Sequence, residues 1–155
     1  MFTLIPSHFF DPATAREALA EVTPLKEEDT VWHIEIPQYD AVLVFSKDGD
    51  SAVEEGDTPE IYSLLSRLSD CPEYNKILCS LKDDRLYLAV AQGKSLLLAN
   101  SFPARDFTTA EYYIFLSLNS LQLNPEISTI CWLSELDADD EMSLYRYFKA
   151  VVHLV

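Results

Sequence analysis

Residues 75–102, NKILCSLKDDRLYLAVAQGKSLLLANSF, contain three apolar segments separated by two short polar turns. The apolar segments span 76–81, 86–91 and 95–102. Each is long enough for a strand, and the turns at Asp83-Asp84 and Gln92-Gly93-Lys94 have the length of hairpin connections. The sequence therefore predicts three consecutive antiparallel strands.

A helix, a strand and a last helix are predicted after this meander. Residues 108–123 are apolar nearly all round, which predicts a deeply buried helix, and 127–133 have the composition of a fourth strand. Acidic residues at 137–141 favour the start of a final helix, whose buried stripe includes Val151 and Val152. The order β-β-β-α-β-α is that of the ribonuclease-H-like unit, a mixed-sheet α/β fold found in nucleases and actin-like ATPases.

The first part of the chain follows a β-α-β-β-α order. Strands are predicted at 2–5, 30–36 and 41–45, and helices from Asp11-Pro12 to 22 and over 61–68. The second helix stops near Cys71-Pro72. This break predicts two halves, 1–72 and 73–155, and the alternation over 30–36 favours Trp32 as a core residue rather than an interface residue.

Composition excludes several classes of function. The chain has 155 residues, 48% of them hydrophobic, and a formal net charge of −15. Such a surface repels phosphate backbones and anionic membranes, so we expect no nucleic-acid partner and no membrane insertion. Three cysteines (Cys71, Cys79 and Cys131) without paired spacing, and an N-terminus without a positively charged flank, favour a cytoplasmic protein.

No motif for catalysis, metal binding or phosphate binding occurs. The chain has only three glycines, so no glycine-rich phosphate loop is present. The acidic stretch 48–57 fails the calcium-loop pattern because apolar residues occupy ligand positions. The histidines His8, His33 and His153 share no metal-ligand spacing. We therefore expect no catalytic residue, no metal and no cofactor.

Two alternatives stay open at the first hairpin. A two-metal nuclease needs converging carboxylates, and the candidates are Asp83 or Asp84 with Glu111 and Glu135. The two aspartates lie in the turn, however, rather than within a strand. A nucleotide-binding, ATPase-like protein would instead have a weak cleft near Asp83, Asp84 and Gly93, although the Asp83-Asp84 turn itself contains no glycine.

Several segments resemble an uncharacterised bacterial family. These segments are NKILCS (75–80), LYLAVAQG (86–93), LLLANSF (96–102), FTTAEYY (107–113), LQLNP (121–125), FTLIPS (2–7) with Phe10-Asp11, and DAVLVF (40–45). The resemblance covers nearly the whole chain, but the segments are strand cores, turns and helix caps. They therefore carry information about fold and none about chemistry.

Members of that family carry a domain of unknown function with an actin-like ATPase fold. Because they are longer at the N-terminus, the resemblance implies that this chain is a shortened member that lacks the first phosphate hairpin. It also implies an exposed sheet edge that another chain covers. The function expected from these observations is that of a degenerate, non-enzymatic actin-like domain, which binds a protein partner or a second copy of itself.

Overall fold

The structure, a computed structural model, describes residues 2–47 and 59–154. Contacts between residues divide the chain into two compact units, Met1–Pro59 and Glu60–Val155. The acidic stretch 48–57, tested above against the calcium-loop pattern, lies outside the described residues. The assignment of 1–72 and 73–155 as two actin-like halves stays a prediction.

The first unit contains a three-stranded antiparallel sheet of order β1-β3-β2. Its elements are β1 (Phe2–Pro6), η1 (Ser7–Phe9), η2 (Pro12–Thr14), α1 (Ala15–Ala20), β2 (Thr30–Ile36), η3 (Pro37–Tyr39) and β3 (Ala41–Lys47). The side chain of Asp11 accepts a hydrogen bond from the Ala13 N–H at 2.9 Å, so the predicted cap is confirmed. Ala15 and Leu19 of α1 pack on Val42 and Val44 of the central strand.

The prediction of Trp32 as a core residue is wrong. Its side chain is 40% exposed, and the Lys47 ammonium lies 5.4 Å from its ring centroid. Val31, the next residue along the strand, is the one that packs against the α1 core. Alternation identifies the two faces of a strand, but on an edge strand such as β2 it does not say which face is covered.

The second unit contains a five-stranded mixed sheet of order β6-β5-β4-β7-β8. Its elements are α2 (Glu60–Arg67), η4 (Leu68–Asp70), β4 (Asn75–Lys82), β5 (Arg85–Gln92), β6 (Ser95–Pro103), α3 (Phe107–Ser120), η5 (Pro125–Ile127), β7 (Thr129–Trp132), α4 (Ala138–Tyr145) and β8 (Ala150–His153). Strands β4, β5 and β6 form an antiparallel meander, while β7 is parallel to β4 and β8 is parallel to β7. The predicted meander is confirmed, and so is the order β-β-β-α-β-α from β4 to α4, after which the additional strand β8 follows.

The final helix is shorter than predicted. It ends at Tyr145, and Ala150–His153 form β8 instead of a helical stripe that contains Val151 and Val152. The parallel ladder begins where the Lys149 N–H donates to the Ser128 carbonyl at 3.0 Å. Adjacent valines favour a strand once a paired edge is available, which local periodicity cannot reveal.

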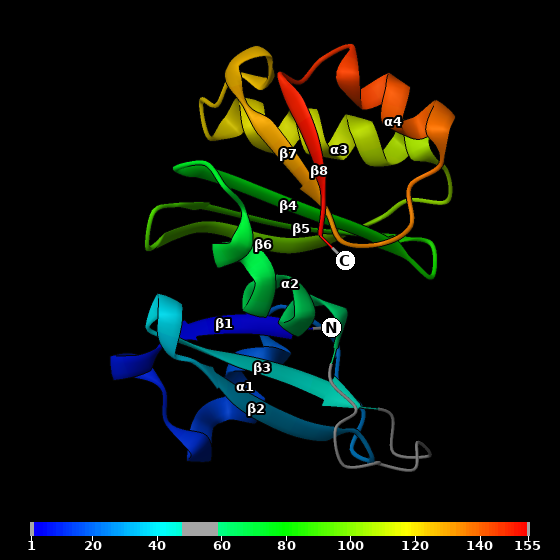
Figure 1. Cartoon of the computed structure of the whole chain (residues 1–155). Helices are drawn as coiled ribbons and strands as arrows, with labels where there is room; N and C mark the ends of the chain where they lie inside the picture. Colours follow the sequence, from blue (N-terminus) through cyan, green and yellow to red (C-terminus); the bar gives the residue numbers. More distant parts are fainter. Residues whose placement is uncertain (1, 48–58, 155) are drawn as a thin grey trace. The chain divides into compact units, whose positions relative to one another are not determined.

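Helices cover both faces of this sheet (Figure 1). Helices α3 and α4 lie on one face, over a core of strand residues that includes Ile77, Leu88 and Trp132, and α2 packs on β4, β5 and β6 from the other. Helix α3 is not buried all round, contrary to the prediction, because Tyr112 and Leu116 are 60% and 49% exposed. The apolar composition of α3 does not indicate that only one side of the helix packs against the sheet.

Candidate functional site

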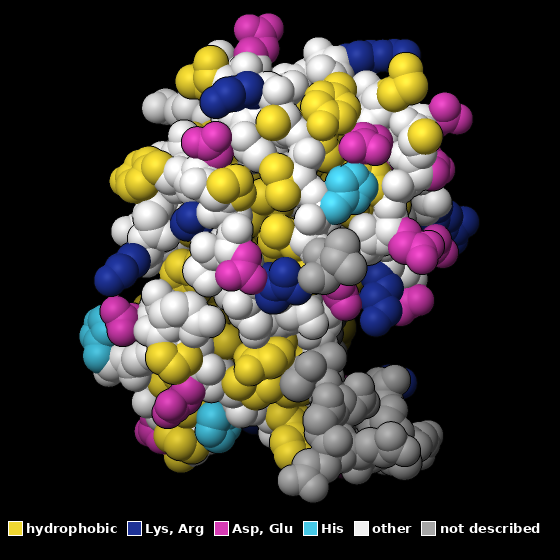
Figure 2. Space-filling view, in the orientation of Figure 1, with side chains coloured by type: hydrophobic (Ala, Val, Ile, Leu, Met, Phe, Trp, Pro, Cys, Tyr) yellow, Lys and Arg dark blue, Asp and Glu magenta, His cyan; other side chains and the backbone are white. Residues whose placement is uncertain are grey.

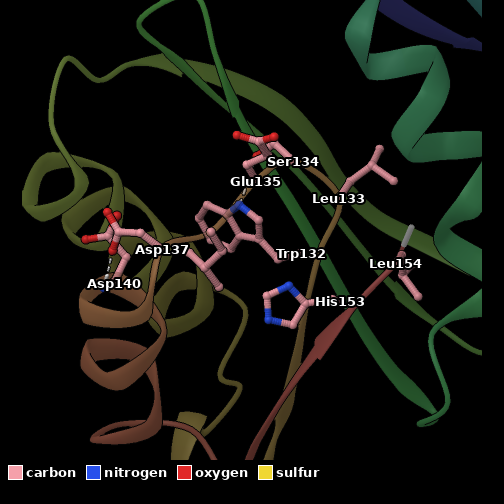
Figure 3. Close-up of a pocket in the computed structure, with 9 residues that line it drawn as sticks. Trp132, Leu133, Ser134, Glu135, Asp137, Asp140, His153 and Leu154 are labelled. Atoms are coloured by element: carbon pink, nitrogen blue, oxygen red, sulfur yellow. Dashed lines mark hydrogen bonds between the residues drawn. The ribbon is translucent and has the colours of Figure 1, made fainter.

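A pocket opens at the carboxyl ends of β7 and β8 (Figure 3). Because the two strands are parallel, both end at the same edge of the sheet. The pocket has a volume of about 630 Å³. Its lining comes from the end of β7, the following loop, the start of α4 and the end of β8: Trp132, Leu133, Ser134, Glu135, Leu136, Asp137, Asp140, His153 and Leu154. Ligands of open α/β sheets bind at this kind of edge, so the pocket is the candidate site.

Hydrogen bonds hold the wall that follows β7 in place. The Ser134 Oγ accepts from the Trp132 indole N–H at 2.9 Å and from the Leu81 N–H at 3.0 Å. The Leu133 N–H donates to the Cys79 carbonyl at 2.8 Å. This side of the pocket is therefore tied to the end of β4.

Carboxylates dominate the charge of the pocket. Asp137 caps α4, since its Oδ1 accepts from the Asp140 N–H at 2.9 Å. Burial raises the pKa of the Asp140 carboxyl, and the neighbouring charges of Asp137 and Asp139 raise it further. The Nε2 of His153 lies 3.2 Å from an oxygen of Glu141. Around the pocket, hydrophobic side chains reach the surface over β7 and β8, with acidic side chains nearby (Figure 2). Such an arrangement disfavours a polyphosphate ligand.

The structure places Asp83 and Asp84 in the turn between β4 and β5. Both have positive φ, 51° and 58°, as a tight two-residue hairpin requires. The Asp84 carbonyl accepts from the Ala104 N–H at 2.9 Å, which fixes the turn backbone. Because β4 is parallel to β7, this turn lies at the same sheet edge as the pocket, but neither aspartate lines the pocket.

Gly93 lies at the opposite end of the sheet. It follows β5, whose eight residues separate it from Asp84 by roughly 25 Å. Its φ is 57°, its N–H donates to the Tyr74 carbonyl at 3.0 Å, and an added Cβ would lie 3.1 Å from the Tyr74 ring. Turn geometry explains this glycine. Asp83, Asp84 and Gly93 therefore do not form one cleft.

The nuclease carboxylates do not converge either. Glu111 lies in α3, and the Ser143 hydroxyl of α4 donates to its carboxylate oxygens, at 2.9 and 3.0 Å. Burial raises the pKa of Glu111, and this hydrogen bond lowers it in part. Of the nuclease candidates only Glu135 lines the pocket. Within 2–47 and 59–154, no group of three metal-ligating side chains lies close enough to hold an ion.

Sequence reasoning missed most of the pocket. Trp132 and Ser134 were not predicted as site residues, and His153 was only dismissed for its spacing from the other histidines. The other two histidines, His8 and His33, lie in the first unit, and both are exposed. The signal that could have identified the pocket is the shared carboxyl edge of two parallel strands, which requires β8 to be recognised as a strand.

The chain has an actin-like ATPase fold. A crystal structure from Bacteroides thetaiotaomicron VPI-5482, described as a protein with actin-like ATPase fold and unknown function, superposes with a TM-score of 0.78 at 19% sequence identity. The superposition covers 99% of this chain and 64% of that chain. The resemblance predicted from sequence is therefore confirmed for the fold.

A family model described as "Protein of unknown function (DUF3822)" matches residues 58–151. The chain belongs to this family. No curated protein matches it. In the part of the chain that the structure describes, no helix has the length and apolar character needed to cross a membrane.

Proposed function

We propose that this protein is a non-enzymatic assembly module whose edge strand β6 pairs with β6 of a second copy. The observation that carries the proposal is the character of β6. None of its nine residues is buried, whereas five of the eight in the neighbouring β5 are. None of the nine is charged. Edge strands usually carry charges or are short, because open backbone groups pair with other chains.

A hydrogen bond shows which backbone groups of β6 face outward. The Ser101 N–H donates to the Asn100 side chain at 2.8 Å. An N–H bonded to β5 is not available to a side chain, so Ser101 presents its backbone groups to the open side. Since these groups alternate along an antiparallel strand, Ala99 presents its own there as well. A second strand can bond to both residues once the Asn100 amide turns away.

The charge of the chain favours a second copy at this edge over other surfaces. Two copies with a net charge of −15 each repel one another over most of their surfaces. Strand β6 contributes no charge to that repulsion. A two-fold antiparallel β6–β6 contact would bring identical strands together, which is the usual geometry of a homodimer.

A bulge limits the length of the proposed contact. Val90 pairs with Leu98 and Ala91 with Leu96, so Leu97 has no partner on β5. Residues 98–103 pair regularly with β5 and form the straight part of the edge. The contact is therefore centred near Asn100.

The test is the mass in solution, measured by light scattering over a concentration series. We expect the wild type to approach twice 17.6 kDa as concentration rises. Asn100→Lys should remain a monomer, because two lysines would face each other across the contact. Asn119→Lys is the matched control: it makes the same charge change at an exposed position of α3 and should still dimerise. A wild type that stays monomeric, or equal loss in both variants, would contradict the proposal.

A second candidate function is nucleotide binding in an ATPase-like cleft. The observation in its favour is the pocket, which shares its sheet edge with the β4–β5 turn. Three carboxylates line that pocket, from Glu135, Asp137 and Asp140, and they oppose a triphosphate unless cations accompany it. Thermal melting with and without ATP and magnesium tests this candidate: a rise of several degrees would support it, and no change would contradict it.

A further inference from the structure

The pocket at the carboxyl ends of β7 and β8 has two chemically different sides. Asp137 and Asp140 lie on one side of the Trp132 ring (Figure 3). Leu133 and Leu154 lie on the other side of that ring. The volume of about 630 Å³ is in the range of small-molecule sites. A ligand that fills the pocket therefore needs a polar group at one end and an apolar body at the other.

The charged side of the pocket has no compensating cation. Glu135, Asp137 and Asp140 contribute three carboxylates, and the first two residues are exposed, so a ligand can reach them from solvent. Within residues 2–47 and 59–154, no Lys or Arg forms an ion pair with any of the three. Burial raises the pKa of the Asp140 carboxyl, and the charges of Asp137 and Asp139 raise it further. A cation in the pocket would relieve this repulsion.

The start of α4 explains only part of this negative charge. Acidic residues in the first turn of a helix favour its dipole, and Asp137 also caps the helix by accepting from the Asp140 N–H. Glu135 precedes the cap by two positions and lies outside the helix. Its carboxylate therefore adds negative charge to the pocket that helix formation does not require.

The spacing of the carboxylates favours an organic cation over a metal ion. In the part of the chain that the structure describes, no three His, Cys, Asp or Glu side chains lie close enough to hold an ion. A metal ion needs its oxygen ligands within about 2.0–2.6 Å. An alkylammonium group has three N–H donors that point in different directions, and each reaches a carboxylate oxygen about 2.7–2.9 Å away. It can therefore bond to carboxylates that are too far apart for a metal.

We propose that this pocket binds a small organic amine with an apolar body, such as an arylalkylamine. The ammonium group lies among the carboxylates of Glu135, Asp137 and Asp140, and the apolar body extends past Trp132 toward Leu154. This site does not depend on dimerisation through β6. It is also distinct from the nucleotide-binding alternative, because an amine and a triphosphate need opposite charges in the same pocket.

The first experiment compares three probes that carry a phenyl ring and differ in charge. They are 2-phenylethylamine, the neutral 2-phenylethanol and the anionic 3-phenylpropionate. The chain has two tryptophans, so Trp32→Phe leaves Trp132 as the only indole fluorophore, and calorimetry on the wild type gives a second measurement. We expect the amine to bind with a Kd of roughly 0.1–1 mM, and the alcohol and the acid at least about tenfold more weakly. Equal binding of amine and alcohol, or no binding of the amine, would overturn the proposal.

Charge variants locate the bound amine. Asp140→Asn should weaken amine binding roughly fivefold, while Asp140→Glu should retain most of it. Asp139→Asn is the matched control, because it makes the same charge change in the same helical turn at an exposed residue that does not line the pocket. It should change the Kd less than about twofold. Equal weakening in the two Asn variants would show attraction to an acidic surface only, against the proposal. Glu135→Gln, outside α4, repeats the test without altering the helix.

Discussion

The two edge strands of the five-stranded sheet, β6 and β8, differ in almost every feature that controls pairing. β6 has nine residues and no charge. β8 has four residues, and it ends with His153, which pairs with Glu141. The Tyr145 hydroxyl also donates to the Val151 carbonyl of β8 at 3.4 Å. One edge is thus short and occupied by side chains, while the other is long and neutral.

The difference is what we expect of a sheet that protects one edge and pairs through the other. Natural proteins blunt edge strands by short length, charge and side-chain cover, and β8 is short and has side chains bonded at its edge. On β6, only two features interrupt the edge, and both are local. They are the bulge at Leu97 and the hydrogen bond from the Ser101 N–H to the Asn100 side chain, which can break and re-form. The comparison can be tested by changes on each side of the sheet.

The largest expected effect comes from two phenylalanines that pack on α3 next to the two edges. Phe148, which precedes β8, is 4% exposed and stacks on Phe115 with ring centroids 5.9 Å apart. Phe102 of β6 is half-buried and stacks on Tyr113 at 4.7 Å. We expect Phe148→Ala to lower the free energy of unfolding by about 3–5 kcal/mol and Phe102→Ala by about 1–3 kcal/mol.

Urea denaturation followed by circular dichroism measures both variants. It should be done at a concentration where the wild type is monomeric, so that dimerisation does not add to stability. Equal losses would show that the β6 side contributes as much to the core as the β8 side. The difference between β6 and β8 would then concern only how each strand pairs with another chain, and not how much each side contributes to stability.

The next effect tests how α4, which leads into β8, is fixed to α3. In Ser143→Ala the buried Glu111 carboxylate loses its hydroxyl donor, and we expect a loss of about 1 kcal/mol. Burial already raises the pKa of Glu111, and the Ser143 bond lowers it, so the variant has a still higher folded pKa. When a carboxyl has a higher pKa in the folded state than in the unfolded state, the unfolded state loses its proton first. Stability therefore declines as the pH rises from the unfolded pKa to the folded pKa.

The loss in Ser143→Ala should therefore be larger at pH 7 than at pH 5. Urea denaturation at both pH values measures it. The double variant with Glu111→Gln is the control, because it removes the titrating group and should show the same loss at both. A loss that is larger at the lower pH would contradict the assignment of Glu111 as a carboxylate penalised by burial.

A smaller effect is expected from Tyr145→Phe, which removes the hydroxyl over β8. The bond to the Val151 carbonyl is long, so the free energy of unfolding should fall by about 0.5 kcal/mol or less. The oligomeric mass should not change, because β8 remains short and paired with β7. A new dimer in this variant, detected by light scattering, would show that the hydroxyl is what keeps this edge closed.

The smallest effect is expected from ATP with magnesium. The pocket beside β8 is lined by carboxylates, and the Asp83-Asp84 turn offers no glycine for close approach of a phosphate. We expect no change in melting temperature by differential scanning fluorimetry, with magnesium alone as the control. A rise of several degrees with ATP–magnesium would favour the nucleotide-binding function and direct attention to the hairpin.

The meander was predictable because its signals are local. Apolar segments of strand length and two short polar turns lie within residues 75–102, and each strand pairs with the next. The cap at Asp11 was equally local. By contrast, β8 pairs in parallel with β7 across a helix, and its four residues continue an apolar pattern that also suits a helix.

The candidate site was largely unpredictable for the same reason. The pocket exists only because the ends of β7 and β8 meet at one edge, so its residues share no spacing in the sequence. Asp83, Asp84 and Gly93 are predicted as a cleft because they lie in short turns, but the length of β5 separates Gly93 from the two aspartates. Which side of α3 or β2 is covered likewise depends on tertiary packing, as Tyr112 and Trp32 show.

The occupied β8 edge has a consequence for the size of any complex formed through this sheet. A sheet with two open edges can add copies at both ends and grow into a filament. Here β8 is short and has side chains bonded at its edge, so under the proposed β6 pairing each copy would have a valence of one at this sheet. Association through β6 would stop at a closed pair, and raising the concentration would saturate that pair instead of driving polymerisation.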